Sequence, residues 1–177
     1  AEEASSGARA MRGTIRVGMP PLFGTHFLPR VLPAFLAEHP ELRVELVSTM
    51  RLTDVVEKGL DLAIAVGELP DSSLVARPLG HGELVVVASP RYLADAGSPR
   101  APADLARHRC LVYARPDGRD AEWVFRGDVG DRPLAVSGRA RSDDMHHLAA
   151  MAVAGLGVAQ LPLFAVAAEI EAGSLRR

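Results

Sequence analysis

The sequence predicts an α/β protein composed of two lobes. Apolar residues alternate along the chain between a period of two, typical of strands, and a period of 3.6, typical of helices. The order strand, helix, strand, helix, strand in the first half is the signature of a parallel sheet with crossover helices. A turn-rich break at Ser89-Pro90 then separates this half from a less regular second half. We therefore expect lobes at residues 13–89 and 90–177.

The first lobe begins with a short strand, in which Ile15 and Val17 flank Arg16 before Gly18. A helix follows at residues 28–38 and ends at His39-Pro40, and Pro33 within it predicts a local bend. Its expected inner face consists of Leu28, Val31, Leu32, Phe35 and Leu36.

The rest of the first lobe follows the same alternation. Residues 42–46 alternate as a half-buried strand, and a short helix carrying Leu52, Val55 and Val56 ends before Gly59. Nearly continuous apolar runs at 60–66 and 84–88 predict two further strands.

The second lobe is predicted in shorter pieces. A helix is expected at 91–94, and strands at 110–113, 123–125, 134–136 and 158–161. One helix opens at Asp143-Asp144, and the last runs from Leu163 to Ala172 before Gly173.

Composition and charge exclude several functional classes. The 177 residues are 48% hydrophobic and 24% charged, which excludes a disordered chain. No run of about 18 apolar residues exists to span a membrane. The net charge is −2, and acidic and basic residues are mixed along the chain, so nothing forms the basic stripe of a nucleic-acid-binding domain. The single cysteine, Cys110, fits a reducing, cytoplasmic setting.

Residue patterns that often carry chemistry have simpler interpretations here. Adjacent His146 and His147 point in different directions on a helix, so we expect no metal site. Cys110 fits a buried strand better than a nucleophile. Gly155-Leu156-Gly157 suits tight packing of a helix end onto a strand better than a dinucleotide fingerprint. Asp143-Asp144 suits a helix N-cap with a first-turn acid better than a catalytic pair. We expect no enzyme activity, no metal and no cofactor.

Ligands of open parallel sheets bind beyond the carboxyl ends of the strands. In the first lobe the loops at these ends are 19–25, 48–52 and 67–73. Ser48 and Thr49 place hydroxyl groups where the second helix opens, and helix N-termini favour anionic ligands. Two interpretations stay open at this stage: Ser48 or Thr49 caps that helix, or they contact a ligand.

Nearly the whole chain from residue 13 onward resembles the effector-binding domain of LysR-type transcriptional regulators. Each matching stretch is weak alone, but together they occur in order and at family-like spacing. They are residues 13–18, 27–29, 35–40, 42–46, 60–64, 67–74, 84–93, 102–105, 108–111, 123–125 and 154–162.

The resemblance implies two Rossmann-like lobes with an effector cleft between them, as in type 2 periplasmic binding proteins. It places a small-molecule effector, with an organic acid as one candidate class, against three groups of residues. These groups are Pro20, Pro21, Leu22 and Phe23; Ser48 and Thr49; and Asp143 and Asp144. The first group is less polar than is usual in the family, and Asp143 stands where many relatives have Asn. That extra carboxylate weakens the case for an anionic effector.

The resemblance also implies partners. DNA binding would belong to a helix-turn-helix domain preceding this chain, with residues 1–12 as the end of its linker. Relatives continue past Arg177 with strands that return to the first lobe. We expect a homodimer or tetramer, paired through the outer face of the 28–38 helix with the 42–47 strand, and through the 148–154 helix. A solute-binding protein of a transporter is the alternative from another class.

Overall fold

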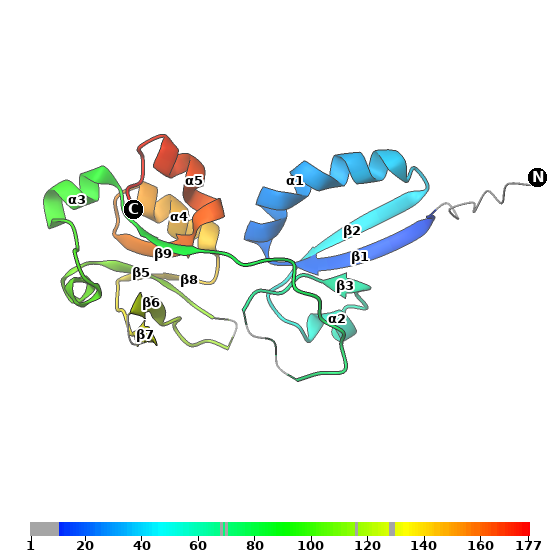
Figure 1. Cartoon of the computed structure of the whole chain (residues 1–177), viewed down its shortest axis with the longest axis horizontal. Coiled ribbons are helices and arrows are strands. Elements are labelled where there is room, and N and C mark those ends of the chain that lie inside the picture. Colours follow the sequence, from blue (N-terminus) through cyan, green and yellow to red (C-terminus); the bar gives the residue numbers. More distant parts are fainter. Residues whose placement is uncertain (1–10, 68, 70, 116, 128–129) are drawn as a thin grey trace, which may run out of the picture. The chain divides into compact units, whose positions relative to one another are not determined.

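The computed structural model describes residues 11–67, 69, 71–115, 117–127 and 130–177. The chain divides into two compact units, one ending at Ser73 and one beginning at Leu74 (Figure 1). Within the described part of the chain, none of the helices combines the length and apolarity needed to cross a membrane. Residues 1–10 of the expected linker segment lie outside the described residues.

The division comes earlier in the chain than the boundary expected after residue 89. Strand β4 (Leu84–Val87) pairs with β9 (Val158–Pro162) of unit 2 in antiparallel register, and not with the first sheet. An apolar run predicts a buried strand but does not tell which sheet the strand joins. The strand expected at 84–88 is therefore present, and it belongs to unit 2.

Unit 1 is built on a parallel sheet of β1 (Gly13–Met19), β2 (Leu42–Ser48) and β3 (Leu62–Ala63) in the order β2-β1-β3. The chain moves from β1 to one neighbour and then back past β1 to the other. Right-handed crossovers of this kind place the two connecting helices on opposite faces. Figure 1 shows α1 (Pro21–Glu38) and α2 (Asp54–Glu57) on opposite sides of the sheet.

Two expectations for unit 1 are wrong. The strand expected at 60–66 is confined to Leu62–Ala63, and Val66 is 71% exposed, because β3 pairs only with β1 at the edge of the described sheet. The expected inner face of α1 is covered only in part: Leu28, Leu32 and Leu36 are half-buried, whereas Val31 is 59% exposed and Phe35 is exposed as well. The helix is continuous through Pro29 and Pro33, and it curves along its length in Figure 1.

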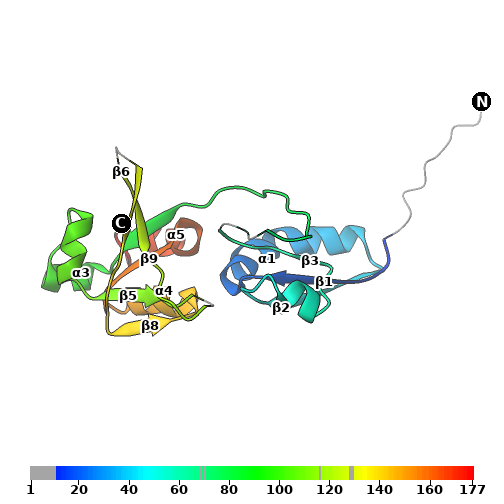
Figure 2. The ribbon, with the colours of Figure 1, turned by 90° about the horizontal axis from the view of Figure 1, so that it is seen from below.

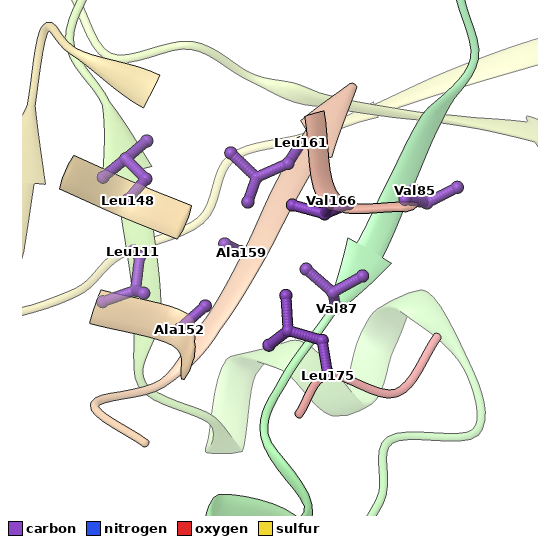
Figure 3. Close-up of a cluster of buried hydrophobic side chains, with 9 residues drawn as sticks. All are labelled: Val85, Val87, Leu111, Leu148, Ala152, Ala159, Leu161, Val166 and Leu175. Carbon is purple, nitrogen blue, oxygen red and sulfur yellow. The ribbon is translucent and has the colours of Figure 1, made fainter. Parts of the chain in front are cut away.

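Unit 2 has a mixed four-stranded sheet in the order β4-β9-β5-β8. Strand β5 (Cys110–Tyr113) runs parallel to both β9 and β8 (Ala140–Ser142). Helices α4 (Met145–Val153) and α5 (Leu163–Glu171) pack on one face and enclose the main core. Figure 3 shows this cluster, which contains Val85, Val87, Leu111, Leu148, Ala152, Ala159, Leu161, Val166 and Leu175.

The other face of the unit 2 sheet is covered by shorter elements. They are α3 (Pro90–Ala96), the 3₁₀ helix η1 (Pro102–Arg107), and a hairpin of β6 (Trp123–Gly127) and β7 (Gly130–Leu134), which projects from the sheet in Figure 2. Tyr92, Leu105, Cys110 and Trp123 are buried there. The strand expected at 134–136 lies earlier in the chain and ends at Leu134, because β7 forms an antiparallel hairpin with β6.

The Gly155-Leu156-Gly157 segment confirms the packing interpretation. Gly155 has φ +82° just after α4. A Cβ atom on Gly157 would lie 2.0 Å from the carbonyl oxygen of Arg109, whose backbone accepts a hydrogen bond from the Val158 N–H at 2.8 Å. Glycine is needed here because the helix end passes against the backbone before β5.

Candidate functional site

The first candidate edge lies where the parallel strands of unit 1 end. We define it as Met19 to Phe23, after β1, together with Ser48 to Asp54, after β2. The Thr49 N–H donates to the carbonyl oxygen of Met19 at 2.9 Å, so the two loops start side by side. A Cβ on Gly18 would lie 2.5 Å from Leu60 Cδ1 and 3.1 Å from Thr49 Cγ2, so glycine permits this close approach.

Thr49 is tied to a buried carboxylate. Its Oγ1 lies 2.5 Å from Asp54 Oδ2 and accepts from the Arg51 N–H at 3.0 Å. Asp54 is 4% exposed, and Lys58 Nζ lies 2.6 Å from the same oxygen. The hydrogen bonds from Lys58 and Thr49 lower the pKa of Asp54, against a smaller opposing effect of burial. The carboxylate is therefore ionised at neutral pH and holds the loop together.

Ser48 and Thr49 do not cap α2. The N-cap residue is Thr53, without a side-chain cap bond, and the Thr49 hydroxyl bonds the side chain of Asp54 instead. The capping interpretation is thus wrong, and the ligand-contact interpretation stays a prediction. Ser48 is exposed and Thr49 is half-buried, so both side chains are accessible.

The four residues after β1 differ in what they present. Pro20 and Leu22 are buried, while Pro21 and Phe23 are half-buried. Phe23 stacks on Phe27 one turn later, with ring centroids 4.5 Å apart. Pro20 is the N-cap of α1 and Pro21 its first residue, so neither supplies an N–H at the helix N-terminus.

The second candidate edge lies at the matching ends of β5 and β8 in unit 2. We define it as Tyr113 together with Ser142 to His147. Tyr113 and Ser142 are register partners in adjacent parallel strands. Directly after them, the Ala114 N–H donates to the Ser142 carbonyl oxygen at 2.8 Å. Helix α4 begins here, so this edge combines strand ends with a helix N-terminus, as the first edge does.

Side chains around the start of α4 are paired. Asp144 is the N-cap: its Oδ1 accepts from the His146 N–H at 2.8 Å and lies 3.0 Å from His146 Nδ1. Ser142 Oγ accepts from the Asp144 N–H at 3.0 Å and lies 3.0 Å from His147 Nδ1. The N-cap interpretation is confirmed, although the expected first-turn acid is absent because the cap is the second Asp of the pair.

The pKa values of Asp144 and Tyr113 are shifted at this edge. Partial burial raises the pKa of Asp144, but the N–H and the ring of His146 outweigh it, and the net shift is downward. Burial raises the pKa of Tyr113, and the nearby negative charges of Asp143 and Asp144 raise it further. Asp143 itself is exposed, and within the described part of the chain it has no hydrogen bond or ion pair.

An apolar groove lies beside the first edge, between α1 and β2. Its volume is about 470 Å³. Leu28, Leu32 and Leu36 line it from the helix, and Leu46 and Val47 line it from the strand. Met19, Pro21 and Ser48 close the end that adjoins the first edge.

The described residues hold no cluster of three His, Cys, Asp or Glu side chains that would bind a metal ion. Cys110 is buried, and burial raises the pKa of its thiol to about 11. What the two edges do offer is hydrogen-bonding and charged side chains at strand ends, which suits reversible binding of a small polar molecule.

Sequence reasoning missed several residues at these edges. Lys58 stands four residues after Asp54, a spacing that predicts a helical ion pair and was available in the sequence. Ser142, His147 and Tyr113 carried no such signal, because they meet only through the pairing of β5 with β8 and the start of α4.

Comparisons with known proteins show the family of the chain. Residues 8–177 match the family described as "LysR substrate binding domain". The chain is 38% identical over 164 residues to the HTH-type transcriptional activator AaeR of Escherichia coli K12, covering 92% of this chain and 52% of AaeR. It is 34% identical over 166 residues to an uncharacterized HTH-type transcriptional regulator of Haemophilus influenzae, covering 94% of this chain and 57% of that protein. The chain thus spans about half the length of these curated relatives.

Solved structures give the same result. The regulatory domain of CrgA, a LysR-type transcriptional regulator from Neisseria meningitidis, superposes with a TM-score of 0.83 at 30% identity, covering 94% of this chain and 80% of that chain. The full-length virulence activator AphB of Vibrio cholerae gives 0.81 at 26% identity, covering 95% of this chain and 57% of that chain. These relatives are transcriptional regulators, not transporter proteins. The chain belongs to the family of LysR substrate-binding domains.

Proposed function

We propose that the whole protein is a transcriptional regulator and that residues of each edge defined above contact a small-molecule effector. The observation that supports this most directly is their shared construction. Each edge gathers accessible polar side chains at the carboxyl ends of parallel strands, beside the start of a helix. This is where open α/β sheets bind ligands.

A thermal-shift screen of small metabolites on residues 1–177 tests effector binding. A ligand that binds the folded chain raises its melting temperature. For such a ligand, Thr49→Val is expected to weaken binding by about 1–3 kcal/mol, the cost of leaving a buried polar ligand group unpaired. Thr49→Ser is the matched control, since it keeps the hydroxyl. Equal calorimetric affinities for the wild type and Thr49→Val would remove Thr49 from the site.

The apolar groove supports a second part of the proposal, pairing with another copy of the chain. Val31 of α1 and Leu46 of β2 are 59% and 48% exposed, and both belong to the elements that form the groove. Exposed apolar side chains that gather on neighbouring elements mark surfaces for protein contacts. We therefore propose a homodimer that uses α1 and β2, together with the exposed side of α4.

Val47→Glu tests this pairing. Val47 is half-buried in the wall of the groove, so a carboxylate there is introduced into both copies of a symmetric contact. Sedimentation at tens of micromolar is expected to show a dimer for the wild type and a shift toward monomer for the variant. Val56→Glu adds the same carboxylate to α2, away from α1 and β2, at a side chain that is 80% exposed; it is the control and is expected to remain dimeric. A monomeric wild type would contradict this part.

DNA binding is proposed for the part of the regulator that the chain does not contain. The curated relatives are HTH-type regulators about twice as long as the region they share with this chain. We place the whole protein in the cytoplasm, where it would meet DNA.

A further inference from the structure

The second edge presents acceptors. The exposed carboxylate of Asp143 has no hydrogen-bond or ion-pair partner in the described part of the chain. Its neighbour Asp144 is instead satisfied by the N–H and ring of His146. An open carboxylate at a binding edge attracts ammonium and hydroxyl donors and repels other carboxylates.

At the first edge, backbone donors are missing from the start of α1. Pro20 and Pro21 remove two N–H groups from the start of α1, where anions usually bind, and Leu22, which retains one, is buried. The Thr49 hydroxyl hydrogen is directed to Asp54, since the alternative acceptor, the Arg51 carbonyl oxygen, lies 3.5 Å away. Thr49 therefore offers a ligand an oxygen lone pair rather than a hydrogen.

We propose that the effector presents hydrogen-bond donors, as an ammonium or hydroxyl group, to these edges, and that Asp143 and Asp54 set this preference. The inference rests on the proposed function and replaces the organic acid considered from the sequence. Asp143 contacts the effector. Asp54 is a positioning residue, because it acts by fixing the direction of the Thr49 hydroxyl. The competing feature is the exposed side chain of Arg51, which suits a carboxylate.

The test compares three forms of each of three skeletons on residues 1–177. The sets are benzylamine, benzyl alcohol and benzoate; hexylamine, hexanol and hexanoate; and tryptamine, tryptophol and indole-3-acetate. Binding is measured by thermal shift and then by calorimetry. The amine or alcohol is expected to bind more tightly than the carboxylate in every set that binds.

Two variants and their two matched controls sharpen the comparison. Asp143→Asn is expected to weaken amine binding about tenfold, a loss of one favourable charge contact, with a smaller effect on the alcohol. Asp95→Asn removes an exposed carboxylate from α3 and is the matched control, with no expected effect. Pro21→Ala adds one N–H at the first edge and is expected to improve carboxylate binding, whereas Pro29→Ala, further along α1, is not.

The outcomes separate the inference from the proposed function. Tighter binding of carboxylates, lost in Arg51→Ala, overturns the inference and leaves effector binding in place. Amine binding that Asp143→Asn and Asp95→Asn reduce equally also overturns it, since the preference would then reflect net charge. Absence of binding by every member of the three sets counts against the proposed function, and the inference falls with it.

Discussion

Asp54 shows how one buried side chain organises a binding loop. Its carboxylate accepts from Thr49 and pairs with Lys58, so it joins the end of β2 to α2. Nothing in the local sequence marks Asp54 as buried, because its four-residue helix has too few apolar positions to define a face. Lys58 and Thr49 bond the ionised form of this carboxylate, so protonation of Asp54 lowers the stability of the fold.

Ionised Asp54 should make unit 1 sensitive to acid. Its pKa is lower in the folded chain than the ordinary value of 3.8. Its contribution to stability is therefore fully present above pH 3.8 and is lost as the pH falls through the lower folded-state value. Urea midpoints measured from pH 7 to pH 2.5 are expected to fall less steeply below about pH 4 for Asp54→Asn than for the wild type. Asp61→Asn, which removes an exposed carboxylate from the same unit, is the control, and its urea midpoints should follow those of the wild type more closely than the midpoints of Asp54→Asn do. Parallel curves of urea midpoint against pH for the wild type and Asp54→Asn would contradict the prediction.

Cys110 is a second residue whose environment decides its chemistry. Burial raises the pKa of its thiol from 9.0 to about 11, so the reactive thiolate is scarce in the folded chain at pH 8. An aromatic disulfide reagent is expected to label native protein only as fast as it unfolds, and to label urea-unfolded protein at once. Because the folded-state pKa is raised, the stabilisation from the neutral thiol is lost as the pH rises from 9.0 toward 11. Rapid labelling of the native chain at pH 8 would show that the thiol is accessible.

At the scale of elements, the junction from α4 to β9 depends on backbone contact. Gly157→Ala would place a Cβ 2.0 Å from the Arg109 carbonyl oxygen, and relief requires the backbone to move. We expect a loss of about 3 kcal/mol in the free energy of unfolding, at the upper end for overpacking. Gly82→Ala is the control, since a Cβ there meets nothing within 4 Å. Equal urea midpoints for the two variants would mean that the junction yields easily.

Elements differ in how far the sequence predicted them. Helix α4 and strands β5 and β9 were predictable because their apolar positions face a core completed by nearby elements. The strand expected at 60–66 and the inner face of α1 failed for the opposite reason. Their apolar residues are as regular as those of α4, but the described part of unit 1 supplies no neighbour to bury Val66 or Val31. Periodicity identifies the residues that form an apolar face, but neighbouring elements determine whether that face is buried.

The candidate edges were predicted in the same partial way. The pattern located the end of β2, where Ser48 and Thr49 lie, and the N-cap of α4 near Asp144. That these residues contact an effector stays a prediction. The hydrogen-bond direction at Thr49 and the Ser142–His147 contact depend on distances that a sequence does not encode locally.

At the scale of the whole molecule, charge is balanced locally as well as in total. The net charge is −2, and several arginines are paired with carboxylates. Arg16 pairs with Glu45, Arg119 with Asp117, and Arg141 with Asp120, at 2.6–3.0 Å. A guanidinium group held by a carboxylate in this way contributes little field to attract a phosphate backbone.

This balance predicts that residues 1–177 do not bind duplex DNA, even though the whole protein is proposed to regulate transcription. Affinity for DNA comes largely from releasing counterions around phosphates, which needs several unpaired cations on one surface. Fluorescence anisotropy at physiological salt is expected to show no saturable binding by the chain, and sequence-specific binding by the full-length regulator to its promoter DNA. DNA binding by the chain is expected to stay absent at lower salt, because the chain lacks a surface of unpaired cations whose attraction to phosphates salt would screen. Nanomolar binding by residues 1–177 alone would mean that this domain contacts the operator itself, and the division between sensing and DNA binding would have to be abandoned.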